Sequence, residues 1–312
     1  MGQKDLYQSD FYEDNRRFAD VFNGVLFAGR EVVKPWELQE ADSVIVSLSK
    51  KNQGKKVICD KIRKWKGNYV SLMVLENQAY IDYGMVFRVM ESEAFGYNKL
   101  KKQRFLEQRG SGVEFNGNEY LSQMKKGEKF TPIITLVLYL GKNIMWDGET
   151  NLYEMLELDE DLKPYVNNFR LNLFDYHNYE NFDGFQTENR LLFEILSNAD
   201  DKKKMMHLLK QEKGYRSLDE ESAKAILGII GAKVDIEKIK IESEKGEEKY
   251  DMCKAFDDYK EEGRKEGRKE GELSMALKNV KKLMKKQKLT FEQAVAVLEI
   301  SKKMQGKMKA MV

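Results

Sequence analysis

Residues 60–76 read DKIRKWKGNYVSLMVLE, and this stretch decides the fold of the chain. Its first strand begins upstream in KVICDKI (56–62), which is rich in β-forming residues, and a turn is predicted around Gly67. The rest of the stretch is a nearly continuous apolar run, which is typical of a central strand covered on both faces. A hairpin joining the two strands could bring Asp60, which lies within the first strand, and Glu76, which ends the second, side by side.

The segments around this hairpin predict a mixed α/β core. NRRFADVFNGVLFA (15–28) places its apolar residues at helical spacing. SVIVSLS (43–49) alternates like a half-buried strand, and residues 80–108 return to a helical period. TPIITLVLYLG (131–141) is the strongest strand signal in the chain. The predicted order is therefore helix, three strands, helix, strand.

The middle of the chain is expected to be less regular and then helical. Residues 110–130 are polar and Gly-rich, which predicts a loop, and 145–158 predict a loop leading into a short helix. Residues 165–176 predict another strand. Residues 187–230 have a helical period and are expected to form a helical subdomain.

The end of the chain is highly charged and is also expected to be helical. Gly263, Gly267 and Gly271 recur every four residues and would lie nearly in line along a helix. Each costs a helix about 1 kcal/mol relative to alanine, so either a partner helix approaches closely or the segment is a partly frayed connector. Residues 276–301 predict two short amphipathic helices, with Thr290 and Gln293 forming a capping box.

Composition suits a soluble globular protein and neither requires nor excludes nucleic acid as a partner. The 312 residues include 54 basic and 52 acidic side chains, a net charge of +2. Cationic runs such as 61–66 and 99–104 fit solvated surfaces as well as nucleic-acid binding. Cys59 and Cys253 lack the spacing of a disulfide framework or zinc site. The sequence has no apolar stretch long enough for a membrane helix and no pattern of a secretory leader. We therefore expect a cytoplasmic protein without a membrane partner.

Two acids on adjacent strands meet the minimal requirement of phosphodiester hydrolysis. A divalent cation polarises the phosphate and lowers the pKa of an attacking water, and hard cations prefer oxygen ligands. Asp60 and Glu76 would supply carboxylates, and Gln78 lies two residues beyond Glu76. A chain with 52 acids produces such pairs easily by chance. A carboxylate that ends a buried strand nevertheless needs a partner, which a metal would provide.

The run LENQAYIDYGMVFRVM (75–90) resembles the segment that marks the Rpn (recombination-promoting nuclease) group, whose members are also called transposases. Further similar segments are RFADVFNGVLFAG (17–29), ITLVLYLG (134–141), WDG (146–148) and the EEGRKEGRKEG tail. The similarity in this order extends from residue 5 to about residue 301.

The resemblance implies a PD-(D/E)xK restriction-endonuclease-like core with a helical C-terminal extension. It implies a DNA endonuclease dependent on Mg²⁺ (or Mn²⁺), linked to recombination, mobile elements or genome defence. In this comparison Asp60 takes the place of the motif's aspartate, Glu76 that of its second acid and Gln78 that of its lysine. Asp60 and Glu76 would hold the metal, while Gln78 would orient the water or a phosphate oxygen.

Glutamine at position 78 departs from the superfamily motif. A lysine would bring positive charge to the transition state, whereas glutamine offers a neutral dipole. Lys61, Arg63 and Lys64 are the nearby cations that could supply the charge instead.

Two further residues are accessory candidates. Asp20 on the first helix either assists the acids or serves as a surface or helix-packing polar group. Arg88 either meets a phosphate or pairs with Glu91 or Glu76. His177 and His207 lack a second ligand at metal spacing and are interpreted as surface or packing residues.

Three functions follow from these observations. The first is a metal-dependent DNA endonuclease, and the second is a degenerate nuclease-fold protein that binds DNA or protein without cutting. The third is an unrelated α/β protein whose helical tail mediates self-association. We divide the chain into a nuclease-like domain (1–185), a helical subdomain (186–250) and a tail (251–312) for DNA engagement or for assembly, expected as a homodimer.

Overall fold

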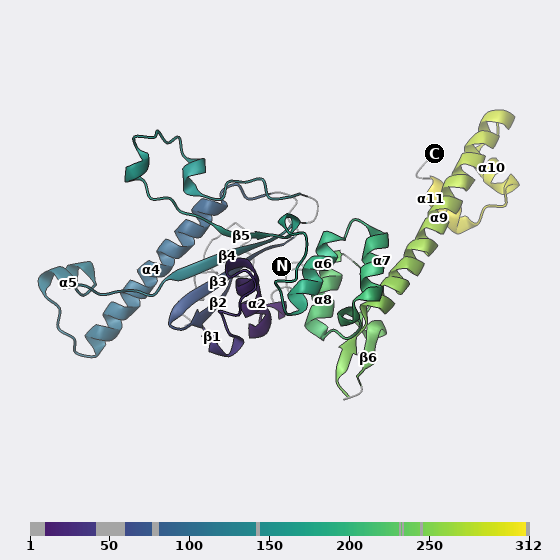
Figure 1. The fold of residues 1–312 in the computed structure, drawn as a ribbon. Helices are drawn as coiled ribbons and strands as arrows, with labels where there is room; N and C mark the ends of the chain where they lie inside the picture. Colours follow the sequence, from purple (N-terminus) through teal and green to yellow (C-terminus); the bar gives the residue numbers. More distant parts are fainter. Residues whose placement is uncertain are drawn as a thin grey trace. The chain divides into compact units, whose positions relative to one another are not determined.

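The computed structural model describes residues 10–41, 60–76, 81–141, 144–230, 232, 234–243 and 246–309. The chain divides into two compact units (Figure 1). Unit 1 comprises Met1–Ala232 and Lys240–Met252, and unit 2 comprises Lys233–Ile239 and Cys253–Val312. The strand predicted at 43–49 and the candidate residue Gln78 lie outside the described residues.

Unit 1 is built on a five-stranded mixed sheet in the order β1-β2-β3-β4-β5. The strands are β1 (Leu38–Glu40), β2 (Asp60–Trp65), β3 (Asn68–Glu76), β4 (Ile133–Leu140) and β5 (Asn172–Asp175). β1, β2 and β3 pair antiparallel, whereas β3–β4 and β4–β5 pair parallel. Mixed α/β architecture is therefore confirmed.

The predicted hairpin between β2 and β3 is present and has a two-residue turn. Trp65 pairs with Asn68, and the residues between them, Lys66 and Gly67, have φ of 48° and 81°. Two consecutive positive φ angles give the type I′ turn, whose twist matches that of the flanking strands. The turn fixes the register that sets Asp60 opposite Met73.

Helix α2 (Asn15–Leu26) confirms the first predicted helix. Asp14 caps it by accepting a hydrogen bond from the Arg16 amide at 2.7 Å. Its buried face includes Phe18, Val21 and Phe22, which the helical spacing had indicated.

Helix α4 (Met85–Gly110) connects β3 to its parallel neighbour β4. It begins five residues later than predicted, because Ile81–Gly84 form a turn in which the Gly84 amide donates to Asp82. The helical spacing of 80–108 predicts an apolar stripe of Ile81, Met85, Val89 and Met90. The first three pack with Val137 and Tyr139 of β4, whereas Met90 is half-buried.

The prediction of a loop for 110–130 is wrong in part, because α5 (Gly117–Ser122) forms there. Asn116 accepts from the Glu119 amide at 2.9 Å, and Glu119 accepts from the Asn116 amide at 3.1 Å. This reciprocal capping box stabilises a helix in a segment whose composition indicated a loop.

The remainder of unit 1 is largely helical, as predicted for 187–230. It contains α6 (Glu188–Ser197), α7 (Lys202–Gln211) and α8 (Glu220–Ile230). An aromatic cluster of Phe174, Tyr179, Phe182, Phe185 and Phe193 joins β5 to α6. The strand predicted over 165–176 is confined to β5, because short 3-10 helices flank it.

The charged segment after α8 contains a hairpin that sequence did not predict. β6 (Lys240–Glu242) pairs antiparallel with β7 (Glu248–Tyr250), and Tyr250 also pairs with Leu218. The 3-10 helices are η1 (Pro35–Glu37), η2 (Leu152–Met155), η3 (Lys163–Tyr165), η4 (Tyr176–Asn178), η5 (Lys213–Arg216) and η6 (Ile236–Ile239).

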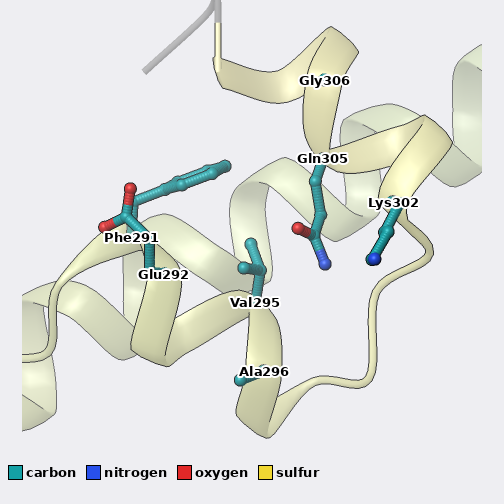
Figure 2. Close-up of a pocket in the computed structure, with 7 residues that line it drawn as sticks. All are labelled: Phe291, Glu292, Val295, Ala296, Lys302, Gln305 and Gly306. Atoms are coloured by element: carbon teal, nitrogen blue, oxygen red, sulfur yellow. The ribbon is translucent and has the colours of Figure 1, made fainter.

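Unit 2 is helical, with α9 (Met252–Gln287), α10 (Phe291–Val297) and α11 (Lys302–Lys309). Val280, Ala294 and Val295 are its buried core, and the predicted capping box of Thr290 and Gln293 is confirmed. The expected first short helix of 276–301 is instead the end of α9. A hollow of about 340 Å³ separates α10 and α11, lined by Phe291, Val295 and Gln305 among others (Figure 2).

Among the helices of the described residues, none combines the length and the apolar composition required to span a bilayer.

Candidate functional site

One edge of the sheet gathers the polar residues of interest. β3, β4 and β5 are parallel, so their carboxyl ends lie at the same edge, where β2 begins. Glu76 pairs with Leu140, and Tyr139 pairs with Asp175. Ligand sites in parallel sheets occur outside the carboxyl ends of the strands. This edge is therefore the candidate site.

Two of the three predicted catalytic residues belong to this edge by backbone position. Asp60 is the first described residue of β2 (Asp60–Trp65), and Glu76 is the last described residue of β3 (Asn68–Glu76). The partner of Asp60 is Met73, which lies three residues before Glu76 on the adjacent strand. The third residue, Gln78, follows Glu76 outside the described part of the chain.

Asp20, an accessory candidate, holds the beginning of α6. Its buried carboxylate accepts hydrogen bonds from the Gln186 and Thr187 amides at 2.8 and 3.1 Å. It also accepts from the Thr187 hydroxyl at 2.5 Å and from Asn189 Nδ2 at 3.0 Å. These contacts satisfy the charge and tie α2 to the N-terminus of α6, which fits a helix-packing role.

Arg88, the other accessory candidate, pairs with a residue that sequence had not suggested. Its Nη1 lies 3.4 Å from Asp82 Oδ2 in the turn before α4. Its Nη2 atom is buried and has no hydrogen-bond partner among the described residues. A desolvated guanidinium nitrogen without an acceptor is costly. An anion close to the end of β3 would satisfy it.

The cations that could replace the missing lysine are partly engaged. Lys61 and Arg63 both pair with Glu13, and Arg63 does so at 2.8 Å. Burial raises the pKa of Glu13, but hydrogen bonds from Lys61 and Arg63 outweigh it and leave this pKa below its ordinary value. Both cations thus anchor β2 to the segment preceding α2. Lys64 lies with its ammonium 6.0 Å from the centre of the Tyr69 ring.

Sequence reasoning missed Asp175, the last residue of β5. Its buried carboxylate accepts from the Trp146 amide at 2.8 Å and from the His177 amide at 3.1 Å. His177 Nδ1 lies 2.6 Å from the same carboxylate. The segment at Trp146 is therefore fixed to β5. The one feature of the sequence that could have indicated Asp175 is its position near the end of the strand predicted over 165–176.

Two tyrosines complete this network. Tyr139 donates to the Ile144 carbonyl at 2.9 Å, and Tyr176 donates to the Gly141 carbonyl at 2.8 Å. Burial, followed by the negative charge of Asp175, raises the pKa of both phenols. They remain neutral hydrogen-bond donors that fix the chain where it leaves β4.

Among the residues whose side chains are described, no three His, Cys, Asp or Glu side chains converge as a metal site. The candidate carboxylates of Asp60 and Glu76 are not part of that set. Their chemistry, two oxygen donors from adjacent strands, suits a hard divalent cation.

The fold and this edge define a mixed α/β protein with acidic residues at the adjoining ends of two central strands. Residues 61–226 match the model of the family described as "Putative transposase, YhgA-like". The match covers more than half of the 312 residues, and the chain belongs to this family, confirming the resemblance to the Rpn group. Neither the curated proteins nor the solved structures include a match to the chain.

Proposed function

We propose that this chain is a divalent-metal-dependent DNA endonuclease with a PD-(D/E)xK-type core. Asp60 and Glu76 would hold Mg²⁺ or Mn²⁺. The observation that carries the proposal is that these two acids lie on adjacent, paired strands, toward the sheet edge where the described part of β3 ends, within a family of putative transposases. Transposition requires breakage of DNA strands, which is the chemistry that such a pair supports.

The roles follow from the donor chemistry of each side chain. When bound, the ion would polarise the scissile phosphate and lower the pKa of the attacking water. Gln78 would orient that water or a phosphate oxygen through its amide. Because glutamine carries no charge, Arg88 is the described cation best suited to contact a phosphate, since its Nη2 has no partner in the described part of the chain.

A shared ion imposes a specific requirement on the backbone. Pairing is continuous over Asp60–Trp65 of β2 and over Tyr69–Glu76 of β3, and Glu76 lies three residues beyond the partner of Asp60, so this register assigns the two positions to opposite faces of the sheet. The proposal thus requires one of the two strand ends to change register, through a bulge or a strong twist, when the ion binds. Bulges of this kind occur at sheet edges and beside active sites.

Plasmid nicking by the full chain tests the proposal. Wild type should nick with Mg²⁺ or Mn²⁺ and stop when EDTA is added. Asp60→Ala and Glu76→Ala should each reduce the rate by about 100-fold or more, the effect of removing an electrostatic interaction with the transition state. Asp161→Ala removes an exposed acid and should leave the rate unchanged.

Metal binding gives an independent measurement. Titration with Mn²⁺, followed by electron paramagnetic resonance, should reveal a bound ion in wild type and in Asp161→Ala but not in Asp60→Ala. A folded wild type that binds DNA and leaves the plasmid intact with both metals would reject the nuclease and support a degenerate DNA-binding protein.

A further inference from the structure

One projection of unit 1 has a local excess of positive charge. We define the α4–α5 arm as residues 99–129, comprising the second half of α4, α5 and the segments after them (Figure 1). The arm contains eight basic and four acidic residues, a net charge of +4, whereas unit 1 as a whole has a net charge of −5. Unit 2 has a separate basic stretch, since residues 276–309 contain ten lysines and two glutamates.

The arm has a small aromatic core that holds it together. The ring of Phe105 packs edge-on against Phe115 at 5.0 Å and against Tyr120 at 5.7 Å. Arg109 lies over both Phe105 and Tyr120, and Lys125 lies over Phe115. α5 is therefore fixed against the end of α4, which makes the arm a defined surface.

Two of the four acids are largely buried within the arm, so they reduce the positive charge at its surface only slightly. The Glu128 side chain is 9% exposed, lies 3.1 Å from Arg104 and accepts from Gln108 at 2.9 Å. The Glu119 side chain is 14% exposed and accepts from backbone amides and from Lys125. Glu107 and Glu114 remain exposed.

The exposed cations of the arm are available to a partner. Lys102, Lys126 and Lys129 are exposed, and none of their ammonium groups has an ion pair within the described residues. At the base of the arm, a polar groove of about 460 Å³ lies between α4 and the β2–β3 hairpin. Lys64 of the hairpin and Arg104 of α4 both line it.

We propose that the α4–α5 arm and the groove at its base bind the phosphate backbone of duplex DNA. The inference rests on the proposed function: the groove lies at the turn end of β3, opposite the end that holds Glu76, so a duplex bound by the arm would run along the sheet to reach the candidate site. Outward lysines around a fixed core neutralise phosphates and release counterions.

Fluorescence polarisation with a labelled duplex in EDTA measures binding without cleavage. The test variant is Lys102→Gln/Lys126→Gln/Lys129→Gln. Its control, Lys203→Gln/Lys204→Gln/Lys210→Gln, removes equal charge from exposed positions on α7. Between about 50 and 200 mM salt, the slope of log K against log salt should fall by about 0.9 for each phosphate that the arm variant no longer neutralises. The control should keep the wild-type slope, and both should keep the wild-type melting temperature.

The outcomes separate this inference from the nuclease proposal. If the salt slope of DNA binding depends on the arm but wild type never nicks the plasmid, the arm is a DNA-binding surface and the chain is not a nuclease. If wild type nicks the plasmid while the arm and control variants bind DNA equally, the arm is not the DNA-binding surface, and the nuclease proposal is unaffected. No duplex binding by wild type, or retention only on anionic lipid vesicles, overturns the arm as a DNA surface.

Discussion

The glycine at position 24, in the second half of α2, is required by the packing of a neighbouring aromatic ring. A methyl group there would overlap the ring of Phe185, which belongs to the cluster between β5 and α6. We expect Gly24→Ala to destabilise unit 1 by about 1–3 kcal/mol through overpacking, despite the better helix propensity of alanine. Urea unfolding measures the change.

The matched control for that substitution is Gly306→Ala. Gly306 lies within α11, and no atom beyond its own helix surroundings lies within 4 Å of the added methyl group. This variant should be neutral or stabilise the helix by up to about 1 kcal/mol. Equal effects of the two substitutions would show that the Phe185 ring does not restrict position 24.

Asp20 makes a second residue-scale prediction, because its two possible roles have different consequences. Its carboxylate accepts four hydrogen bonds from the start of α6. Asp20→Asn places an amide donor against these donors and should lower the free energy of unfolding by about 1–3 kcal/mol. Thermal melting and plasmid nicking are measured together. Loss of nicking at unchanged stability would instead assign Asp20 to the catalytic acids.

At the scale of an element, α5 depends on one carboxylate. Amide hydrogen bonds from Lys126 and Asn116, with Lys125 beside them, lower the pKa of Glu119 from 4.5 to about 2. A lowered folded-state pKa means that this stabilisation is complete above pH 4.5 and is lost as the pH falls toward 2. NMR shifts of the α5 amides should report loosening in that window.

The corresponding variant is Glu119→Gln. It retains the size of the side chain and an acceptor oxygen but cannot titrate, so α5 should be weaker at neutral pH and should lose the pH dependence. An identical acid response of wild type and Glu119→Gln would attribute the loosening to other groups.

Elements were predictable where one local signal was sufficient. The strands β3 and β4 and the turn at Gly67 could be predicted from local sequence alone, because a continuous apolar run is itself the signal of a central strand. The β6–β7 hairpin was missed, since its residues are mostly charged and its anchor is the pairing of Tyr250 with Leu218. Such a hairpin is stabilised by tertiary contacts that local propensity does not report.

At the scale of the whole molecule, sequence placed Asp60 within one strand and Glu76 at the end of the next, and these two strands do pair. It did not indicate Asp175, because only the parallel pairing of β4 with β5 brings that residue to the same edge. The pairing of Arg88 with Asp82 likewise depends on where α4 begins, and helix boundaries are poorly defined by sequence.

The tail carries a prediction about assembly. α9 runs without interruption through Gly263, Gly267 and Gly271, although each glycine costs about 1 kcal/mol relative to alanine. The core of unit 2 that the structure describes lies further along, between residues 273 and 304. Packing of the glycine-spaced segment against a second copy of the chain would compensate that cost.

We therefore expect deletion of 261–312 to convert a dimer into a monomer. Light scattering after gel filtration measures the mass, with Thr290→Ala, which weakens only the α10 cap, as the control. An unchanged mass on truncation would show that the glycine-spaced helix serves another purpose.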